Sequence, residues 1–248
     1  MAQSLGTVRA TDLSLSLRLE SGRDAVKVES GALHIVIADD HPLFRDALKL
    51  TLQNRLAAAS IEAAGSLEEA MKLISAREID LVLLDLTMPG VQALSGLLYL
   101  RAQFPSVPVI VISATEDRLV ARKCLAFGAA GYVPKSANGA EINEAIEKVL
   151  AGGIYLPAGM EAEGDDDHDA EALAAKLSTL TPQQVKVLMM LSQGLLNKQI
   201  AFELSVSEAT VKAHVSAILT KLGVESRTQA VILAARISGI LPAQAPAG

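Results

Sequence analysis

The chain of 248 residues has one cysteine, no tryptophan and an aromatic content of only 3%. The single cysteine, Cys124, cannot close a disulfide within the chain, and no charged start followed by an apolar run marks a secretion signal. No apolar run approaches the roughly 18 to 20 residues that a membrane-spanning helix needs. These absences argue against a disulfide-rich secreted domain and a membrane protein. We therefore expect a cytoplasmic protein that does not bind membranes.

Charge is distributed unevenly along the chain, although the net charge is only −6. Residues 158–177 hold seven acidic residues and one basic residue, whereas residues 178–248 hold six basic and three acidic residues. The acidic stretch has few bulky apolar residues and repels itself, so we expect an extended, solvated linker over 156–177. The length and the hydrophobic content of 50% suit two domains, one on each side of this linker.

Short apolar runs alternate with helical patterns before the linker. Three of the runs are rich in Val, Ile and Leu without polar alternation, which is typical of parallel strands buried on both faces. The predicted strands lie at 33–38, around Ile61, and at 81–84, 107–112 and 132–133. With helical segments between them, they predict a doubly wound α/β domain over 31–155. Residues 1–30 fit no clear pattern, and we expect a mostly disordered N-terminal extension.

Only helical patterns follow the linker. Helices are predicted at 182–193, 197–204, 208–222 and 227–239. Thr181 and Ser207 stand where helix N-caps are expected, and Gly223 stands where the third of these helices would end. The sequence therefore predicts a small all-α domain with four helices over 178–248.

Three carboxylates come at the ends of two predicted strands. Asp39 and Asp40 follow the first strand and Asp85 follows the third, so all three should meet at the carboxyl edge of the sheet. Each aspartate alone is more simply interpreted as a helix or loop cap. Three like charges this close repel one another unless a cation lies among them, and oxygen ligands of this kind suit Mg²⁺.

Two further polar residues are expected at the same edge. Ser113 ends the fourth strand and Lys135 follows the fifth. A phosphoryl group on Asp85 would need a hydroxyl for hydrogen bonding and an ammonium for charge neutralisation. Taken alone, Ser113 is more simply a loop hydroxyl and Lys135 a solvated surface lysine.

Four motifs resemble the receiver domains of bacterial response regulators: "IVIADDHPLFRDAL", "DLVLLDLTMPG", "VIVISA" and "GAAGYVPKSA". The resemblance covers about half the chain, with the motifs in order. It implies a flavodoxin-like fold with strand order 2-1-3-4-5, Asp85 as the phospho-acceptor, and Asp39 and Asp40 as Mg²⁺ ligands together with Asp85. It also implies that Ser113 is the phosphate-sensing hydroxyl, that Lys135 is the lysine typical of the family and that Tyr132 is the switch aromatic. A simple packing role for Tyr132 is an equally good interpretation.

The segment "LTPQQVKVLMMLSQGLLNKQIAFELSVSEATVKAHVSAILTKLGVESRTQAV" resembles the LuxR-type helix-turn-helix. Together with the receiver motifs, it makes the chain similar to the NarL/FixJ family of response regulators. The segment departs from that family at Gln183 and Gln184, where a charged pair is usual, and at Leu196, where a small polar residue is common. The resemblance implies that this domain binds double-stranded promoter DNA.

The third predicted helix of this domain has one apolar face, and small residues lie opposite it. Small residues would let the helix approach the floor of the major groove, whereas a merely solvated face is the simpler alternative for a generic helix. The DNA contacts we expect are Lys212 at a base edge or phosphate, Ala213 and Ser216 in the groove, and Asn197, Lys198, Thr210 and Lys221 at the backbone. The modest net charge of this domain favours a homodimer on two half-sites. The last helix is the candidate dimer face, through Val231, Ile232, Ala235 and Ile240, and the simpler alternative is that it only closes the core of the domain.

The combined motifs predict a phosphorylation-dependent transcription regulator of a two-component system. Asp85 would take the phosphoryl group from a sensor histidine kinase, and its phosphorylation would relieve receiver occlusion of the recognition helix or promote dimerisation. One alternative is a DNA-binding regulator whose receiver is controlled by a protein partner without phosphorylation. Another is an Asp-nucleophile phosphatase, but such enzymes need a second Asp two residues on, where Thr87 stands. We therefore expect no turnover enzyme.

Overall fold

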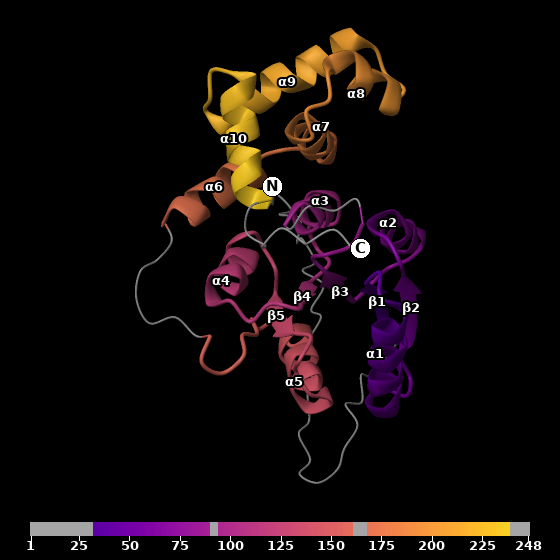
Figure 1. The fold of residues 1–248 in the computed structure, drawn as a ribbon. Helices are drawn as coiled ribbons and strands as arrows, with labels where there is room; N and C mark the ends of the chain where they lie inside the picture. Colours follow the sequence, from indigo (N-terminus) through magenta and orange to yellow (C-terminus); the bar gives the residue numbers. More distant parts are fainter. Residues whose placement is uncertain (1–31, 90–93, 161–167, 239–248) are drawn as a thin grey trace, which may run out of the picture.

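A five-stranded parallel sheet forms the centre of the N-terminal domain in the computed structural model, which describes residues 32–89, 94–160 and 168–238. The strand order is β2-β1-β3-β4-β5, as the receiver motifs implied (Figure 1). The strands are β1 (His34–Ala38), β2 (Ser60–Ala64), β3 (Leu81–Asp85), β4 (Val109–Ser113) and β5 (Gly131–Pro134). Every residue of β3 and β4 is buried, which explains why their sequences lack polar alternation.

Helices cover both faces of the sheet. They are α1 (Pro42–Arg55), α2 (Leu67–Ala76), α3 (Ser95–Gln103), α4 (Arg118–Ala126) and α5 (Gly139–Leu150). One buried cluster joins Ile35 and Leu83 to α1 and α5, whereas another joins Val36 and Leu84 to α2, α3 and α4. Successive strand residues point to opposite faces, so a continuous apolar run supplies both clusters. The predicted doubly wound architecture is confirmed.

The C-terminal domain consists of α7 (Pro182–Ser192), α8 (Asn197–Glu203), α9 (Glu208–Leu222) and α10 (Arg227–Ser238). The side chain of Thr181 accepts a hydrogen bond from the backbone of Gln184 and caps α7, and Ser207 caps α9 in the same way. Gly223 ends α9 with φ +67°, a left-handed conformation that glycine adopts without strain. The four predicted helices and their capping residues are confirmed.

The segment before α7 differs from the expected extended linker. Residues His168–Ser178 form a further helix, α6, which contacts α3, α4 and α9. Its buried residues, Ala170, Leu173, Ala174 and Leu177, follow the i, i+3, i+4, i+7 spacing of one helix face. The prediction of a solvated linker up to residue 177 is therefore wrong for α6, because its apolar stripe outweighs its acidic composition. The acidic residues at 161–167, and the N-terminal extension predicted over 1–30, lie outside the described residues.

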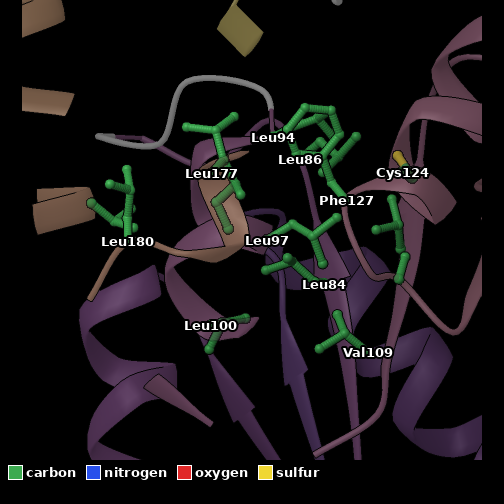
Figure 2. Packing of buried hydrophobic residues seen from close by; sticks show 14 of the residues in the cluster. Leu84, Leu86, Leu94, Leu97, Leu100, Val109, Cys124, Phe127, Leu177 and Leu180 are labelled. Atoms are coloured by element: carbon green, nitrogen blue, oxygen red, sulfur yellow. The ribbon is translucent and has the colours of Figure 1, made fainter. Parts of the chain in front are cut away.

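The two domains share a continuous buried core. Leu177 and Leu180, from α6 and the turn that follows it, belong to the same cluster as Leu94 and Leu97 beside and within α3, as Figure 2 shows. Helix α7 also contacts α3. The C-terminal helices are therefore packed on the N-terminal domain through α6 and α7. None of the helices in the described part of the chain has the length and apolarity needed to cross a membrane.

Candidate functional site

The acidic side chains meet at the carboxyl edge of the sheet, as predicted from the strand ends. Ala38 pairs with Leu84 in the ladder between β1 and β3, so the next residues, Asp39 and Asp85, are neighbours at this edge. Both are 1% exposed, whereas the side chain of Asp40 is 26% exposed. Each of Asp39, Asp40, His41 and Asp85 offers one atom that could bind a metal ion, and these four atoms lie within 4.8 Å of one another.

Lys135 provides the counter-charge to this cluster. Its Nζ lies 2.7 Å from Asp39 Oδ2 and 2.9 Å from Asp85 Oδ2, and it also stands 4.9 Å from the centre of the Phe44 ring. Burial alone would lower the pKa of Lys135, but the hydrogen bonds and charges of the two aspartates outweigh burial and raise it. The ammonium is therefore held in its charged form beside Asp39 and Asp85.

Thr87 makes a direct contact with Asp85. Its hydroxyl lies 2.8 Å from Asp85 Oδ2 and 3.0 Å from Oδ1, and its backbone N–H donates to Oδ1 at 3.2 Å. A hydroxyl that donates to a carboxylate lowers its nucleophilicity, so this contact must loosen before Asp85 can attack an electrophile. The sequence marked Thr87 as the position where a phosphatase has its second Asp, and as a residue that could tune the hydrolysis of an acyl phosphate on Asp85, but did not predict its contact with the Asp85 carboxylate.

Ser113 and Tyr132 come from adjacent strands near this edge. Ser113 is 1% exposed, and its carbonyl accepts a 2.7 Å hydrogen bond from the backbone N–H of Lys135. Tyr132 is completely buried, and its hydroxyl donates to the carbonyl of Thr115 at 2.7 Å. Burial raises the pKa of Tyr132 to about 12. The phenol is thus a packed, neutral donor in this arrangement, and its role as a switch stays a prediction.

The carboxylates present buried oxygens that a divalent cation could bind. Asp39 Oδ2 and Asp40 Oδ1 are buried, and within the described residues Lys135 Nζ lies 2.7 Å from the first and His41 Nδ1 lies 2.9 Å from the second. Hard oxygen ligands on three carboxylates match the preference of Mg²⁺. The residues present therefore fit this ion.

His41 is a member of the cluster that sequence reasoning missed. Its Nδ1 lies 2.9 Å from Asp40 Oδ1 and 3.2 Å from Asp39 Oδ1, and its backbone N–H donates to Asp39 Oδ1 at 2.7 Å. Its position directly after the two aspartates was the available signal. That signal is weak, because the sequence alone does not show whether the side chain of a histidine after a strand points toward the carboxylates or away from them.

The predicted groove face of α9 is open to solvent. Four of the residues expected to contact DNA are exposed on this helix: Thr210, Lys212, Ala213 and Ser216. On the other side of the helix, Val211, Ile218 and Leu222 are buried. In Figure 1, α9 lies at the far end of the C-terminal domain from the receiver sheet. The described part of the receiver therefore leaves this face uncovered.

Two of the expected backbone contacts are engaged within the protein, while a third is free to face DNA. Lys221 Nζ donates to the carbonyl of Thr179 at 2.7 Å and to Gln184 Oε1 at 2.8 Å. Asn197 Oδ1 accepts a 3.0 Å hydrogen bond from Arg227. These bonds tie α9 and α10 to their neighbours, whereas Lys198 on α8 is exposed.

Comparisons with known proteins match both domains. The model of the response regulator receiver domain matches residues 35–147, and that of the bacterial regulatory proteins of the luxR family matches residues 178–234. The glycerol metabolism activator of Pseudomonas putida is 40% identical over 210 residues, covering 82% of this chain and 95% of that protein. The nitrate/nitrite response regulator protein NarP of Escherichia coli (strain K12) is 33% identical over 208 residues, covering 83% and 95%. A solved RcsB–DNA complex is 20% identical, with a TM-score of 0.49 over 84% of this chain and 100% of that chain.

Proposed function

Because the chain belongs to the response regulators that join a receiver domain to a LuxR-type DNA-binding domain, we propose that phosphorylation of Asp85 by a sensor histidine kinase controls its binding to promoter DNA. The protein is thus a DNA-binding transcription regulator of the two-component family. The observation that carries the proposal is the buried Asp85 carboxylate with the Lys135 ammonium 2.9 Å away. We propose the cytoplasm as its place of action, since the kinase domain and the promoter would meet it there.

The proposed reaction transfers a phosphoryl group between two side chains. An Asp85 oxygen attacks the phosphorus of a phosphohistidine, the P–N bond breaks, and its electron pair stays on the imidazole. The charge of the transferring oxygens would be partly neutralised by Mg²⁺ held by Asp39, Asp40 and Asp85. Lys135 then pairs with a phosphoryl oxygen instead of the free carboxylate, and the Ser113 hydroxyl hydrogen-bonds another oxygen. Asp85 keeps the group as an acyl phosphate.

Thr87 argues against the phosphatase alternative. A phosphatase of that kind needs a carboxylic acid at this position to protonate the leaving group and then activate water. The Thr87 hydroxyl contacts Asp85 directly but has no acid–base function near neutral pH. The relatives are transcription regulators rather than enzymes, which fits a protein without turnover. Control by a protein partner without phosphorylation would leave the intact acidic cluster without a use.

We propose that α9 enters the major groove with Lys212 at a base edge or phosphate. Ala213 and Ser216 would allow close approach, and Lys198 and Thr210 would contact the DNA backbone. Asn197 and Lys221 would contribute only if they exchange their present partners for phosphates. Two half-sites would be bound by a homodimer formed through α10, where Ile232 is 55% exposed. Ile240, also expected at this interface, lies outside the described residues.

The open face of α9 favours one of the two modes of control considered from the sequence. Occlusion of the recognition helix by the receiver is not supported, because the groove-facing residues of α9 are exposed while the two domains are packed together. We therefore propose that phosphorylation acts through dimerisation. A dimer would bind two half-sites at once and so raise the affinity without uncovering any new DNA contact.

Phosphorylation of the purified full chain tests this proposal. After incubation with Mg²⁺ and acetyl phosphate, intact mass spectrometry should show one added phosphoryl group on the wild type. Asp85→Asn should not be labelled, because the amide has nearly the same shape but is not nucleophilic. Chelation of Mg²⁺ should also prevent labelling. The matched control is Asp46→Asn on the exposed face of α1, which should be labelled like the wild type. Stable labelling of Asp85→Asn, or metal-independent labelling of the wild type, would contradict the assignment.

A further inference from the structure

We propose that His41 is a fourth ligand of the acidic metal site, and that it selects for divalent transition ions such as Ni²⁺ over Mg²⁺. This inference rests on the proposed function, because the ion would occupy the cluster that supports phosphorylation of Asp85. It extends that function from a site made of oxygen ligands alone to a site with one nitrogen ligand.

The imidazole nitrogen lies as far from two carboxylate oxygens as two neighbouring ligands of one metal ion lie from each other. Its Nδ1 lies 2.9 Å from Asp40 Oδ1 and 3.2 Å from Asp39 Oδ1. Two ligands that each lie about 2.1 Å from one ion, at right angles to each other, are about 3.0 Å apart. The nitrogen and the two oxygens therefore have the separations of neighbouring ligands, and little rearrangement would be needed to bind an ion between them.

The backbone holds His41 in this position. Its N–H donates to Asp39 Oδ1 at 2.7 Å, and the residue is the N-cap of α1, where Pro42 begins the helix. The side chain makes no capping hydrogen bond with the described helix, so the ring is not committed to stabilising α1. It is also 60% exposed, which gives an ion from solvent direct access to the nitrogen.

The kind of ligand atom that His41 supplies determines which metal ions it binds more tightly. Mg²⁺ prefers oxygen ligands and retains water, so replacing one water by an imidazole adds little to its affinity. Imidazole suits Ni²⁺, Zn²⁺ and Cu²⁺, which bind nitrogen strongly. On binding, the Nδ1 lone pair would coordinate the ion, any proton on Nδ1 would pass to solvent, and the Asp40 and Asp39 oxygens that now lie against the ring would bind the ion instead. The acidic site would thus respond to transition ions as well as to Mg²⁺.

Calorimetric titration of the full chain with Mg²⁺ and, separately, with Ni²⁺ tests the proposal. His41→Ala should weaken Ni²⁺ binding about 10-fold to 100-fold, while the Mg²⁺ affinity should change less than about 2-fold. The test is the change in affinity of each metal between the wild type and His41→Ala. A higher affinity for Ni²⁺ than for Mg²⁺ in the wild type alone would not implicate His41, because divalent ions late in the transition series bind most sites more tightly than Mg²⁺. His41→Ala costs no capping bond, so it should fold. A second readout is the visible absorption of bound Co²⁺, which should lose its nitrogen-ligand signature in the variant.

Two controls separate the possible failures. Asp40→Asn should weaken both metals, and His214→Ala, on α9 in the other domain, should weaken neither. If the wild type binds Mg²⁺ but His41→Ala leaves Ni²⁺ affinity and the Co²⁺ spectrum unchanged, the role of His41 is refuted and the proposed phosphorylation site stands. Equal losses of Mg²⁺ and Ni²⁺ would also refute the selectivity. A wild type that binds neither metal would refute the metal site itself, and with it the proposed route of phosphorylation.

Discussion

Individual side chains at the sheet edge determine what a phosphoryl group on Asp85 would have to displace. Lys135 balances part of the negative charge of Asp39 and Asp85, which would otherwise repel each other in a buried environment. Thr87 occupies the Asp85 oxygens by hydrogen bonding. A phosphoryl group would therefore have to displace the hydroxyl of Thr87 and recruit the ammonium of Lys135. Both partners of Asp85 would change in the same step, so the proposed reaction would give the site two distinct arrangements.

The buried phenol of Tyr132 predicts a pH dependence of stability. Burial raises its pKa to about 12 in the folded state, whereas the pKa of a tyrosine in an unfolded chain is about 10. Between these values the unfolded chain releases the proton and the folded protein retains it, so the contribution is present below pH ~10 and is lost as the pH rises toward ~12. In urea unfolding from pH 9 to pH 11, Tyr132→Phe should lose stability less steeply than the wild type. Parallel slopes for the two proteins would show that Tyr132 titrates normally.

Hydrogen bonds join the end of α9 to the turn before α7 and to the first turn of α7. Lys221 Nζ binds the carbonyl of Thr179 and the side chain of Gln184, and Gln184 Oε1 also accepts from the backbone of Thr181 at 3.0 Å. The buried amide of Gln184 therefore caps α7 and fixes α9 at once. In this chain it does so without a negative charge, because Gln184 replaces the charged residue usual in the family.

Restoring a carboxylate at this position should stabilise the C-terminal domain. Gln184→Glu keeps the capping box and adds a charge-assisted bond to Lys221, so the free energy of unfolding should rise by about 1 kcal/mol in urea titration. Gln183→Glu is the matched control, since it adds the same charge to the same helix turn without facing Lys221 and gains only the smaller dipole term. The gain from Gln184→Glu should vanish in a Lys221→Met background. A gain that persists there would rule out the pairing.

The elements differ in how well the sequence predicts them. Strands β3 and β4 are predictable because burial on both faces gives apolar runs that solvated segments lack. Helix α6 was missed because its apolar stripe, four residues spread over the eight positions from Ala170 to Leu177, is interleaved with polar residues and continues an acidic stretch. Similarly, the cluster of Asp39, Asp40 and Asp85 follows from strand order, whereas the approach of His41 and Thr87 depends on loop conformations that residue patterns do not encode.

The whole molecule is organised around the contact between its two domains. Leu177 is 1% exposed and shares a cluster with Leu94 and Leu97 of the receiver, as Figure 2 shows. A hollow of about 560 Å³ remains beside this contact, lined by Tyr99 of α3 and Met189 of α7 among others. The contact holds α7 on the receiver and turns α9 outward. The residue patterns of the two domains do not predict it, because it depends on α6.

Weakening this contact should separate the domains without changing the exposure of α9. Leu177→Ala removes buried apolar volume at a cost of about 2 to 5 kcal/mol, and we expect a larger radius of gyration by small-angle X-ray scattering. Affinity for a duplex with a single half-site should stay within about 2-fold of wild type, since the groove face is already open. Leu52→Ala, on α1 in the other buried cluster, should destabilise the receiver without separating the domains. A several-fold gain in half-site affinity for Leu177→Ala would contradict this account and would support occlusion of α9 by the receiver.

The affinity of the phosphorylated protein for DNA tests the central claim most directly. A duplex with two half-sites would first be selected from a random pool by the full chain, and its affinity then measured by fluorescence anisotropy at one fixed salt concentration. With labelling verified by mass, the phosphorylated wild type should bind about 5-fold to 150-fold more tightly than the unmodified protein. Asp85→Asn should show no change with acetyl phosphate, and Lys212→Ala should bind more weakly in both states. Equal affinity of the phosphorylated and unmodified wild type would contradict control of DNA binding by Asp85.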